Sequence, residues 1–361
     1  MFTPADEHHM ARALRLAARG LFTTTPNPRV GCVMVHGGAV VGEGFHERAG
    51  APHAEINALQ AAGGRADGAT VYLTLEPCSH HGRTPPCVDA LIAARVKRVV
   101  AAMQDPNPRV AGDGFARLRA AGIEVESGLL GDEARELNVG FVARMTRGRP
   151  WVRLKVAGSL DGKTALGNGR SQWITGEEAR ADGHAWRARA CAVLTGIGTV
   201  RDDDPRLTVR AVETPRQPLK VLVDSRLEAP LDARLFAGGN ALVAAAIEVR
   251  EKIARLRDRG VEVVLLPNAS GKVELAELMR ELARRALNEI HVEAGFKLNG
   301  SLVAAGVVDE LLVYLAPSLI GESGQGMFNL PAIDDLAQRR HLFWRDVRRV
   351  GADLRLVARL A

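Results

Sequence analysis

The sequence predicts two α/β domains in one chain, and three observations support this prediction. The 361 residues fit about two domains of roughly 150 residues each. Short apolar strands alternate with short helical segments along most of the chain. The segment 146–150 is polar and rich in turn formers, and a new strand begins at Trp151. We therefore expect a first domain at 1–149 and a second at 150–361.

The first domain is expected to alternate between strands and helices. Residues at helical spacing predict a helix at Met10–Gly20, and Val30–Val35 with Val40–Gly44 predicts a hairpin that turns at Gly37-Gly38. Pro52–Ala62 is expected to be a helix with Pro52 in its first turn. The remaining expected elements are strands at Thr70–Leu75, Val96–Ala102 and Ile123–Glu126 and helices at Val88–Ala94 and Gly114–Ala121.

The second domain repeats this α/β rhythm. The expected strands are Trp151–Val156, Ala190–Leu194, Leu219–Val223, Ala241–Ala245, Val261–Leu265, Glu289–Val292, Leu311–Leu315 and Leu354–Val357. The expected helices are Glu177–Ala188, Val249–Arg259 and Leu275–Ala286. The apolar strand Leu311–Leu315 fits burial within one copy of the chain and extension of a sheet across a subunit interface equally well. This strand therefore does not decide whether the chain forms a homo-oligomer through this domain.

Composition excludes several classes of protein. Apolar residues make up 47% and charged residues 25%, which excludes a disordered chain and a collagen-like fibre. Four cysteines in so long a chain are no disulfide framework. No segment approaches the roughly 18 uninterrupted apolar residues of a membrane helix, and Met1–His9 lacks the pattern of a signal peptide. We expect a soluble cytoplasmic protein without a membrane partner.

The net charge of +6 is spread over the chain and decides no partner by itself. A protein that binds RNA, such as an RNA base editor, is the alternative from another functional class. Such a protein is expected to carry clustered lysine and arginine with interleaved aromatic residues for stacking. The two tyrosines and four tryptophans are scattered instead. We therefore expect a small-molecule substrate and no nucleic acid.

Three features of the first domain indicate a metal site with a proton shuttle. His53 and Glu55 open a predicted helix, Cys78 follows a strand, and Cys87 comes after a loop. His-x-Glu followed by Pro-Cys and a second Cys is the signature of a zinc nucleobase deaminase. Two thiolates and one imidazole bind Zn²⁺ and leave one position for water, whose pKa the metal lowers. Glu55 is close enough to take that proton and return it to the ring nitrogen and the leaving ammonia.

Each of these residues alone also has an ordinary structural interpretation. A lone histidine caps a helix or packs in a core, and a lone cysteine is a small apolar group. The combination at two strand–helix junctions favours the metal site. We expect Cys78 at a helix start, where the positive dipole end favours its thiolate. Cys32 and Cys191 lack partners at ligand spacing and are interpreted as packing residues.

The loop between the two candidate thiolates departs from the usual Cys-x-x-Cys spacing. Eight residues separate Cys78 from Cys87, and they are rich in His, Arg and Pro. His80 or His81 is an alternative metal ligand. We favour a loop that shapes the pocket, with Arg83 available for an anionic group of the substrate.

At this point the first domain resembles a known family, the bifunctional deaminase–reductases of riboflavin biosynthesis. The stretches that carry the resemblance are Thr25–Val33, Ala49–Glu55, Thr74–Cys87 and Asp105–Pro108. The long Cys–Cys loop separates this family from the cytidine and tRNA adenosine deaminases. The resemblance implies a cytidine-deaminase-like α/β/α domain. It also implies zinc ligands His53, Cys78 and Cys87, catalytic Glu55, and substrate contacts near Asn27 and His46.

From the residues alone, Asn27 has a less specific interpretation. It lies between two prolines in a rigid turn, which suits an amide presented to a pyrimidine edge. Without the resemblance it would be interpreted as a turn residue.

The informative stretches of the second domain lie at strand ends, where open α/β sheets bind ligands. Ala157–Lys163 and Thr195–Val200 each follow a strand, and Ser171–Thr175 precedes a helix. Backbone amides in such glycine turns can hold a phosphate, as can the turn within Val292–Gly300. Because Arg201 stands where a dinucleotide fingerprint has its third glycine, an ordinary Rossmann site is not expected. A plain loop is the alternative.

The run Arg201–Arg210 places three acids and three arginines in ten residues. Arginines suit a sugar phosphate and carboxylates suit its hydroxyls, although a solvated charged turn is the alternative. Arg187 and Arg210 are suited to pair a phosphate bidentately. Trp173 is a cofactor contact or, alternatively, a core residue.

In this order the pieces resemble the reductase half of the same family, whose fold is similar to dihydrofolate reductase. The resemblance implies NADPH rather than a bound flavin. The implied NADPH contacts are Ala157, Trp173, Thr199, Asp203, Ser225, Gly295, Phe296, Lys297, Leu298 and Asn299. The implied sugar-phosphate contacts are Ser171, Arg187, Leu207, Arg210 and Glu293. Small residues also occur in the family where this chain has Phe296-Lys297.

The resemblance implies two successive reactions on one pyrimidine ribosyl phosphate. Zinc-dependent deamination of the diaminopyrimidinone gives the uracil, and NADPH-dependent reduction of its ring-opened ribose gives the ribityl product. Asp203 is expected to orient the sugar or to assist ring opening. An alternative keeps the deaminase but makes the second half a regulatory NADPH-binding module without turnover.

Overall fold

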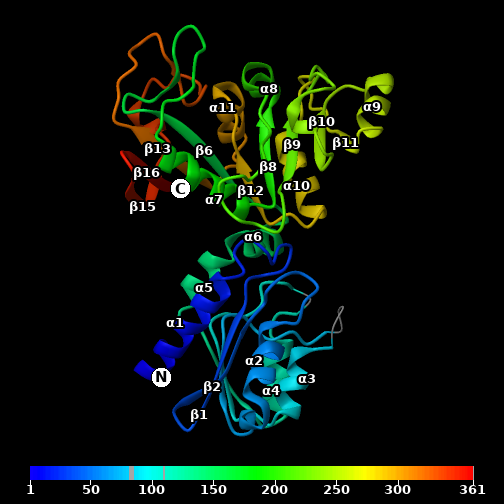
Figure 1. Ribbon diagram of the computed structural model, residues 1–361, viewed down its shortest axis with the longest axis vertical. Helices are drawn as coiled ribbons and strands as arrows, with labels where there is room; N and C mark the ends of the chain where they lie inside the picture. Colours follow the sequence, from blue (N-terminus) through cyan, green and yellow to red (C-terminus); the bar gives the residue numbers. More distant parts are fainter. Residues whose placement is uncertain (81–84, 109, 361) are drawn as a thin grey trace. The chain divides into compact units, whose positions relative to one another are not determined.

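The computed structural model describes residues 1–80, 85–108 and 110–360. These residues divide into two compact units, Met1–Gly148 and Arg149–Ala361, and each is described by itself (Figure 1). No helix within the described ranges combines the length and apolar character that crossing a bilayer requires.

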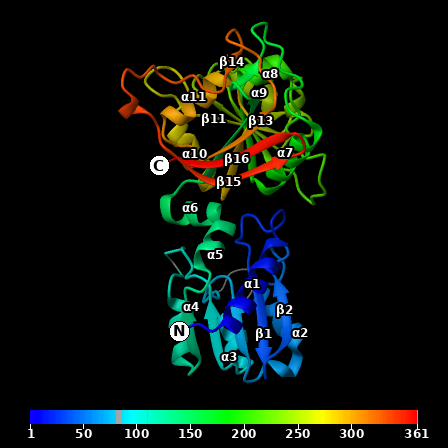
Figure 2. The same ribbon diagram turned by 90° about the vertical axis from the view of Figure 1, so that its left-hand side faces the viewer.

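The first unit is a five-stranded sheet between two layers of helices (Figure 2). The strand order is β2-β1-β3-β4-β5, and β3, β4 and β5 run parallel. The strands are β1 (Gly31–His36), β2 (Ala39–Phe45), β3 (Thr70–Leu73), β4 (Arg98–Ala101) and β5 (Glu124–Ser127). The helices are α1 (Pro4–Ala18), α2 (Ala54–Ala62), α3 (Cys87–Ala93), α4 (Asp113–Ala120), α5 (Gly131–Leu137) and α6 (Val139–Arg147), with a 3-10 turn at Gly63–Ala66.

Alternation along β1 explains the two cores of this unit, because successive side chains point to opposite faces of a sheet. Cys32 and Met34 pack with α2, α3 and α4 on one face. Val33 and Val35 pack with α1 and α5 on the other. Glycines let α2 approach β2 closely: a Cβ on Gly44 would lie 2.5 Å from the Ala54 carbonyl oxygen. The helix that carries Glu55 is thus held against the sheet at backbone contact.

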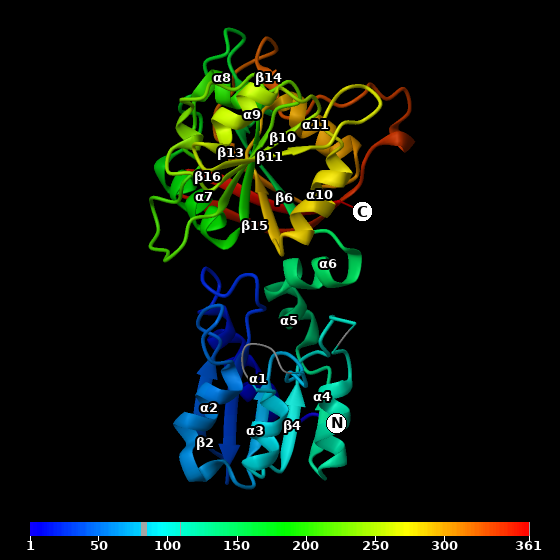
Figure 3. The same cartoon turned by 90° about the vertical axis from the view of Figure 1, so that its right-hand side faces the viewer.

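The second unit is built on a nine-stranded sheet in the order β11-β10-β9-β8-β12-β6-β13-β16-β15 (Figure 3). The strands from β11 to β13 in this order are parallel, and β16 and β15 close the sheet antiparallel. The strands are β6 (Trp151–Ser159), β8 (Ala192–Gly196), β9 (Leu219–Val223), β10 (Ala241–Ala245), β11 (Val261–Leu265), β12 (Glu289–Val292), β13 (Glu310–Ala316), β15 (Leu342–Val350) and β16 (Asp353–Leu360). A separate short pair joins β7 (Lys163–Ala165) and β14 (Gln325–Gly326).

Helices cover both faces of this larger sheet. α10 and α11 pack on one face, whereas α7 and α9 pack on the other. The helices are α7 (Glu177–Arg189), α8 (Ile197–Asp203), α9 (Arg250–Arg257), α10 (Leu275–Arg284) and α11 (Phe296–Ala304), with 3-10 turns at Arg234–Phe236 and Leu336–Gln338. The parallel strands direct their carboxyl ends to one edge, which is where ligands bind in such sheets.

Most expected elements are present, and the differences have local causes. The first helix begins at Pro4, where Thr3 and Asp6 form a capping box. Pro52 precedes the N-cap residue His53, so the expectation that Pro52 lies in the first turn of α2 is wrong. Leu311–Leu315 lies within β13, between β6 and β16, so it is no edge strand. Helices α5, α6 and α8 and strands β7, β14 and β15 were not among the expected elements.

Candidate functional site

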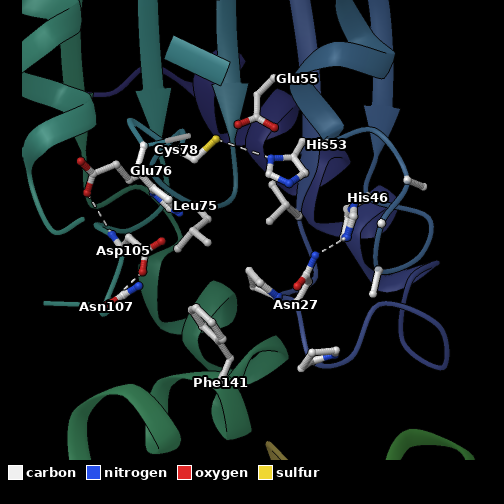
Figure 4. Close-up of a pocket in the computed structure, with 17 residues that line it drawn as sticks. Asn27, His46, His53, Glu55, Leu75, Glu76, Cys78, Asp105, Asn107 and Phe141 are labelled. Carbon is white, nitrogen blue, oxygen red and sulfur yellow. Dashed lines mark hydrogen bonds between the residues drawn. The ribbon is translucent and has the colours of Figure 1, made fainter. Parts of the chain in front are cut away.

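A cavity of about 460 Å³ lies in the first unit (Figure 4). Its wall comes from the loop before β1, the start of α2, the loops after β3 and β4, and Phe141 of α6. Because β3 and β4 are parallel, their carboxyl ends bring two of these loops to one edge of the sheet. His53, Glu55 and Cys78 all line this cavity.

The three candidate metal ligands converge. The ligand atoms of His53, Cys78 and Cys87 lie within 4.8 Å of one another. His53 Nδ1 is 3.3 Å from Cys87 Sγ and 3.6 Å from Cys78 Sγ. Among the described residues, His80 contributes no ligand atom to this group. His81 and Arg83 lie outside the described ranges. The donor set of one nitrogen and two sulfurs is one that zinc prefers.

The expected position of Cys78 at a helix start is wrong. Cys78 lies in the loop after β3, and Cys87 is the first residue of α3. The backbone N–H of Cys87 nevertheless donates to Cys78 Sγ over 3.2 Å, and that of Val88 donates to the Cys78 carbonyl over 3.2 Å. The helix start therefore stabilises the Cys78 thiolate from across the loop, and the contact with Cys87 lowers the pKa of Cys78 to about 4.

Glu55 lies in the first turn of α2, two residues after His53. Its side chain is buried, and its carboxylate points toward His53 and Cys78 (Figure 4). Burial raises the pKa of the Glu55 carboxyl, and the nearby Cys78 raises it further. A carboxylate with a raised pKa beside the ligand cluster is suited to accept and return a proton.

Asn27 and His46 meet beside the ligand cluster, where the His46 ring centroid lies 5.3 Å from that of His53. His46 Nδ1 is 3.1 Å from the Pro52 carbonyl oxygen, which can only accept, so Nδ1 carries the proton. His46 Nε2 then accepts from Asn27 Nδ2 over 3.1 Å. Burial lowers the pKa of His46, which keeps the ring neutral. The amide of Asn27 is thereby turned so that Oδ1 remains as a hydrogen-bond acceptor in the cavity wall.

The cavity also contains residues to which the sequence analysis gave no role. Asp105 and Asn107 line it, and the Asp105 side chain accepts from the Asn107 N–H over 2.8 Å. Burial raises the pKa of Asp105 to about 6. Phe141 contributes an apolar wall from α6. For Asp105 and Asn107, the Asp-Pro-Asn-Pro motif was the one available sequence signal. For Phe141 no sequence signal was available, because α6 was not predicted.

In the second unit, the predicted cofactor residues lie at the carboxyl edge of the parallel strands. Ala157 lies near the end of β6, and Thr199 lies in α8, directly after β8. Ser225 follows β9, and its hydroxyl accepts from the Val273 N–H over 3.1 Å. Gly295 is the N-cap residue of α11, which includes Phe296, Lys297, Leu298 and Asn299. Residues separated by up to about 140 positions in the sequence are thus brought to one edge.

Gln172 connects Trp173 and Asp203, because it directly precedes Trp173 and its side chain bonds to Asp203. Gln172 Nε2 donates to Asp203 Oδ1 over 3.3 Å. The alternative of a core tryptophan is wrong, because Trp173 is 72% exposed, with the Arg180 guanidinium 4.6 Å from its ring centroid. Burial raises the pKa of Asp203. The exposed Trp173 ring and the exposed Asp203 carboxylate are groups that a ligand can reach.

The predicted phosphate clamp is only partly present. Glu293 accepts from both Nε and Nη2 of Arg187, the latter over 2.7 Å, so the bidentate edge of Arg187 is occupied. The Nε–Nη2 edge of Arg187 is thus paired with Glu293 in this structure, and its contact with a phosphate stays a prediction. Arg210 is exposed, and its backbone N–H donates to His184 Nδ1 over 3.2 Å. Burial lowers the pKa of His184 to about 4, and the neighbouring Arg187 and Arg210 lower it as well.

The run that ends at Arg210 is shaped more tightly than a solvated turn. Asp204 and Leu207 have φ of +40° and +54°, a region that side chains other than glycine rarely adopt. Leu207 as a whole is buried. Ser171, the remaining predicted contact, lies in the loop before α7.

The sequence analysis also missed Lys155. It lies on β6 two positions before Ala157, so the two side chains share a face of the sheet. Its Nζ is 5.9 Å from the Tyr314 ring centroid. Burial lowers the pKa of Lys155, with Glu293 and Arg187 as its charged neighbours. A lysine inside an apolar strand was the signal that marked it.

Fold and site together define a zinc-binding pyrimidine deaminase joined to a reductase. Comparison with known families supports both halves: residues 3–103 match the cytidine and deoxycytidylate deaminase zinc-binding region, and residues 150–355 match the RibD C-terminal domain. The chain belongs to the RibD family of bifunctional riboflavin-biosynthesis enzymes. Enzymes of this family carry a zinc-binding deaminase domain and a reductase domain that uses NADPH.

Similar proteins cover nearly the whole chain. RibD of Escherichia coli K12 is 49% identical over 97% of this chain and 98% of its own. RibD of Haemophilus influenzae is 46% identical, with 98% and 97% covered. Among solved structures, Acinetobacter baumannii RibD has a TM-score of 0.92 at 43% identity, and a Thermotoga maritima deaminase/reductase has 0.87 at 34%. Both structures cover 99% of each chain. The predicted fold class and bifunctional activity are thereby confirmed.

Proposed function

We propose that this chain acts on the substrates named for its Thermotoga relative: it deaminates diaminohydroxyphosphoribosylaminopyrimidine and then reduces 5-amino-6-(5-phosphoribosylamino)uracil. Residues 1–149 would carry the deaminase and 150–361 the NADPH-dependent reductase. The observation that carries the first assignment is the convergence of His53, Cys78 and Cys87 beside buried Glu55 in one cavity.

His53, Cys78 and Cys87 are the proposed zinc ligands. Three soft donors from two loops and a helix start fit a catalytic zinc site, in which a fourth position is left to water. When bound, zinc supplies a water activated for nucleophilic attack at neutral pH. The chain contributes the ligand geometry, the thiolate character of Cys78 and a cavity wide enough for a pyrimidine.

Glu55 is the proposed proton carrier. Water adds to the ring carbon that bears the amino group, and Glu55 takes a proton from that water. It delivers this proton to the ring nitrogen, then takes the second proton from the added hydroxyl and passes it to the amino group, which leaves as ammonia while the ring carbon becomes a carbonyl. Burial holds the Glu55 carboxyl at a raised pKa, which suits a group that must bind and release a proton within one turnover.

Asn27 and His46 are the proposed recognition pair of the deaminase. The hydrogen bond from Asn27 to His46 leaves Asn27 Oδ1 to accept from an N–H of the pyrimidine edge. His46 is itself held by the Pro52 carbonyl, directly before ligand His53. Recognition and metal binding are therefore linked through one short segment.

For reduction, the carboxyl edge of the second sheet is the proposed NADPH site. Exposed Trp173, the glycine-bounded start of α11 and Thr199 offer an aromatic face and backbone N–H groups, which suit a dinucleotide. When bound, NADPH supplies hydride for the ring-opened ribose. Ser171, Leu207, Arg210 and the Arg187–Glu293 pair are proposed to hold the sugar phosphate, with Glu293 setting the position of Arg187.

Asp203 is proposed to orient the sugar or to assist ring opening. Its carboxylate accepts from the side chain of Gln172, the residue before Trp173, and partial desolvation raises its pKa. We expect Asp203→Asn to lower the rate of reduction while deamination continues at the wild-type rate. Unchanged reduction in this variant would reject both roles.

We also propose that the chain works in the cytoplasm and assembles through its reductase domain with a second copy. Its four cysteines are free thiols, as in proteins of a reducing compartment. Edge strand β15 exposes Phe343 and Trp344 by 62% and 63%, and such an edge invites another strand. Light scattering of Trp344→Arg is expected to give a lower mass than wild type, and an equal mass would reject this interface.

Two assays on the purified protein test the proposed function. The wild type is expected to release ammonia from the diaminopyrimidine and, with NADPH, to lose absorbance at 340 nm on the deaminated product. Removal of zinc by a chelator is expected to abolish ammonia release and to leave reduction intact. Absence of ammonia release from the zinc-loaded protein would overturn the deaminase assignment. Binding of NADPH without turnover would make the second domain a regulatory module.

A further inference from the structure

A buried carboxylate in the cavity wall is not used by the chemistry described above. Glu76 is 3% exposed and follows β3 directly after Leu75. Its Oε2 accepts from the backbone N–H of Asp105 over 3.1 Å and of Gly112 over 3.0 Å. Its Oε1 accepts from the Phe115 N–H over 3.2 Å. One side chain thus holds three backbone groups of the segment that follows β4.

Two of these bonds, from Gly112 and Phe115, complete the start of a helix. α4 has Gly112 as its N-cap residue, which has no side chain to accept the first free N–H groups. Glu76 supplies that acceptor from a different loop, at the helix end where a negative charge is favoured. Packing is tight at this point: a Cβ on Gly114 would lie 3.1 Å from Glu76 Oε1 and 2.3 Å from the Pro77 carbonyl oxygen. The carboxylate has little room to move.

The same bonds connect two walls of the cavity. The third N–H belongs to Asp105, which lines the cavity together with Asn107 and bonds to it (Figure 4). On its other side, Glu76 lies two residues before Cys78. Glu76 therefore sets the distance between the loop that carries a metal ligand and the loop that faces it.

We propose that Glu76 is a positioning residue of the deaminase, which holds the segment 105–107 in place as the substrate-facing wall opposite Asn27 and His46. It acts through backbone N–H groups, to which both of its carboxylate oxygens are bonded. Displacement of this wall weakens binding of the pyrimidine ribosyl phosphate. The metal ligands and Glu55 stay in place, because they lie in the loop after β3 and at the starts of α2 and α3. The effect is therefore expected on KM more than on kcat. This inference rests on the proposed deaminase function of the cavity.

Glu76→Gln is the direct test, because an amide nitrogen cannot accept and at least one of the three N–H groups loses its partner. We expect the deaminase KM to rise about tenfold, the effect of one unmatched buried hydrogen bond. We expect kcat to change less than threefold and zinc content to equal that of wild type. Asp113→Asn, an exposed change in the same segment, is the matched control and is expected to keep the wild-type KM.

The far-ultraviolet circular dichroism spectrum and the melting curve report whether the first unit of the variant is folded. If Glu76→Gln is not folded, Glu76→Asp replaces it, because the shorter side chain withdraws the oxygens while it keeps the charge. A wild-type KM in the folded variant, or loss of zinc, overturns the proposal. If the wild type itself releases no ammonia, the proposed function fails instead, so the two failures are distinguishable.

Discussion

The pair formed by Asn27 and His46 allows a quantitative test of substrate recognition. Removing either side chain leaves one nitrogen of the other without its partner in the cavity wall, since Asn27 Nδ2 and His46 Nε2 are joined over 3.1 Å. His46 is only 2% exposed, so water does not readily replace the lost partner. An unmatched buried polar group costs about 1–3 kcal/mol, which corresponds to roughly 5- to 150-fold in a rate or binding constant.

We expect Asn27→Ala and His46→Ala each to lower the kcat/KM of ammonia release about 10- to 100-fold. Because each change already breaks the shared bond, the double variant is expected to lose less than the product of the two. A coupling energy of about 1 kcal/mol, roughly fivefold, is expected for two contacting polar groups. The circular dichroism spectrum and the zinc content of each variant serve as the standard for folding of the first unit.

A matched cycle with His36→Ala controls for effects that do not pass through the bond. His36 is exposed at the end of β1, and its combination with Asn27→Ala is expected to be additive. Additivity in the Asn27–His46 cycle as well would refute the reasoning, because the two side chains would then act independently.

Three further predictions concern folding and pH. His184 has a pKa lowered to about 4, below its unfolded value of about 6.5, so its contribution to stability is lost as pH falls from 6.5 toward 4. The control is His184→Gln, whose side chain still accepts from the Arg210 N–H. Between pH 7 and 5, the melting temperature of the wild type is expected to fall more than that of this variant. Arg153→Met leaves two buried carboxylates without a fully buried partner and is expected to cost about 3–5 kcal/mol in chemical denaturation, and an unchanged midpoint would contradict this. Gly44→Ala forces α2 from the sheet and is expected to destabilise the protein by about 1–3 kcal/mol, whereas Gly64→Ala, with open space around it, is expected to be nearly neutral.

The residues that form a sequence motif with a fixed spacing were the most predictable part of the site. His53 and Glu55 are two positions apart at the start of one helix, so their proximity follows from local geometry. Cys78 and Cys87 were identified from their chemistry and order, although the helix begins at Cys87 and not at Cys78. The strands at Leu219–Val223, Ala241–Ala245, Val261–Leu265 and Glu289–Val292 agree with their predicted bounds because buried parallel strands are short, continuous apolar runs.

Long-range hydrogen bonds were not predictable in the same way. Glu76 accepts from Phe115, 39 positions away, and nothing in the local pattern marks it as the cap of α4. The occupied edge of Arg187 was missed because Glu293 lies 106 positions further along the chain. Strand β15 was missed since its residues are mostly exposed and show no alternation of apolar and polar side chains.

The central claim is that three ligands and one carboxylate form a metal-dependent deaminase independent of the reductase. Glu55→Gln tests it most directly, because the change removes the proton carrier and leaves His53, Cys78 and Cys87 in place. We predict one zinc per chain, no detectable ammonia release, and wild-type reduction of the pre-deaminated substrate. Ammonia release at the wild-type rate from this variant would contradict the account.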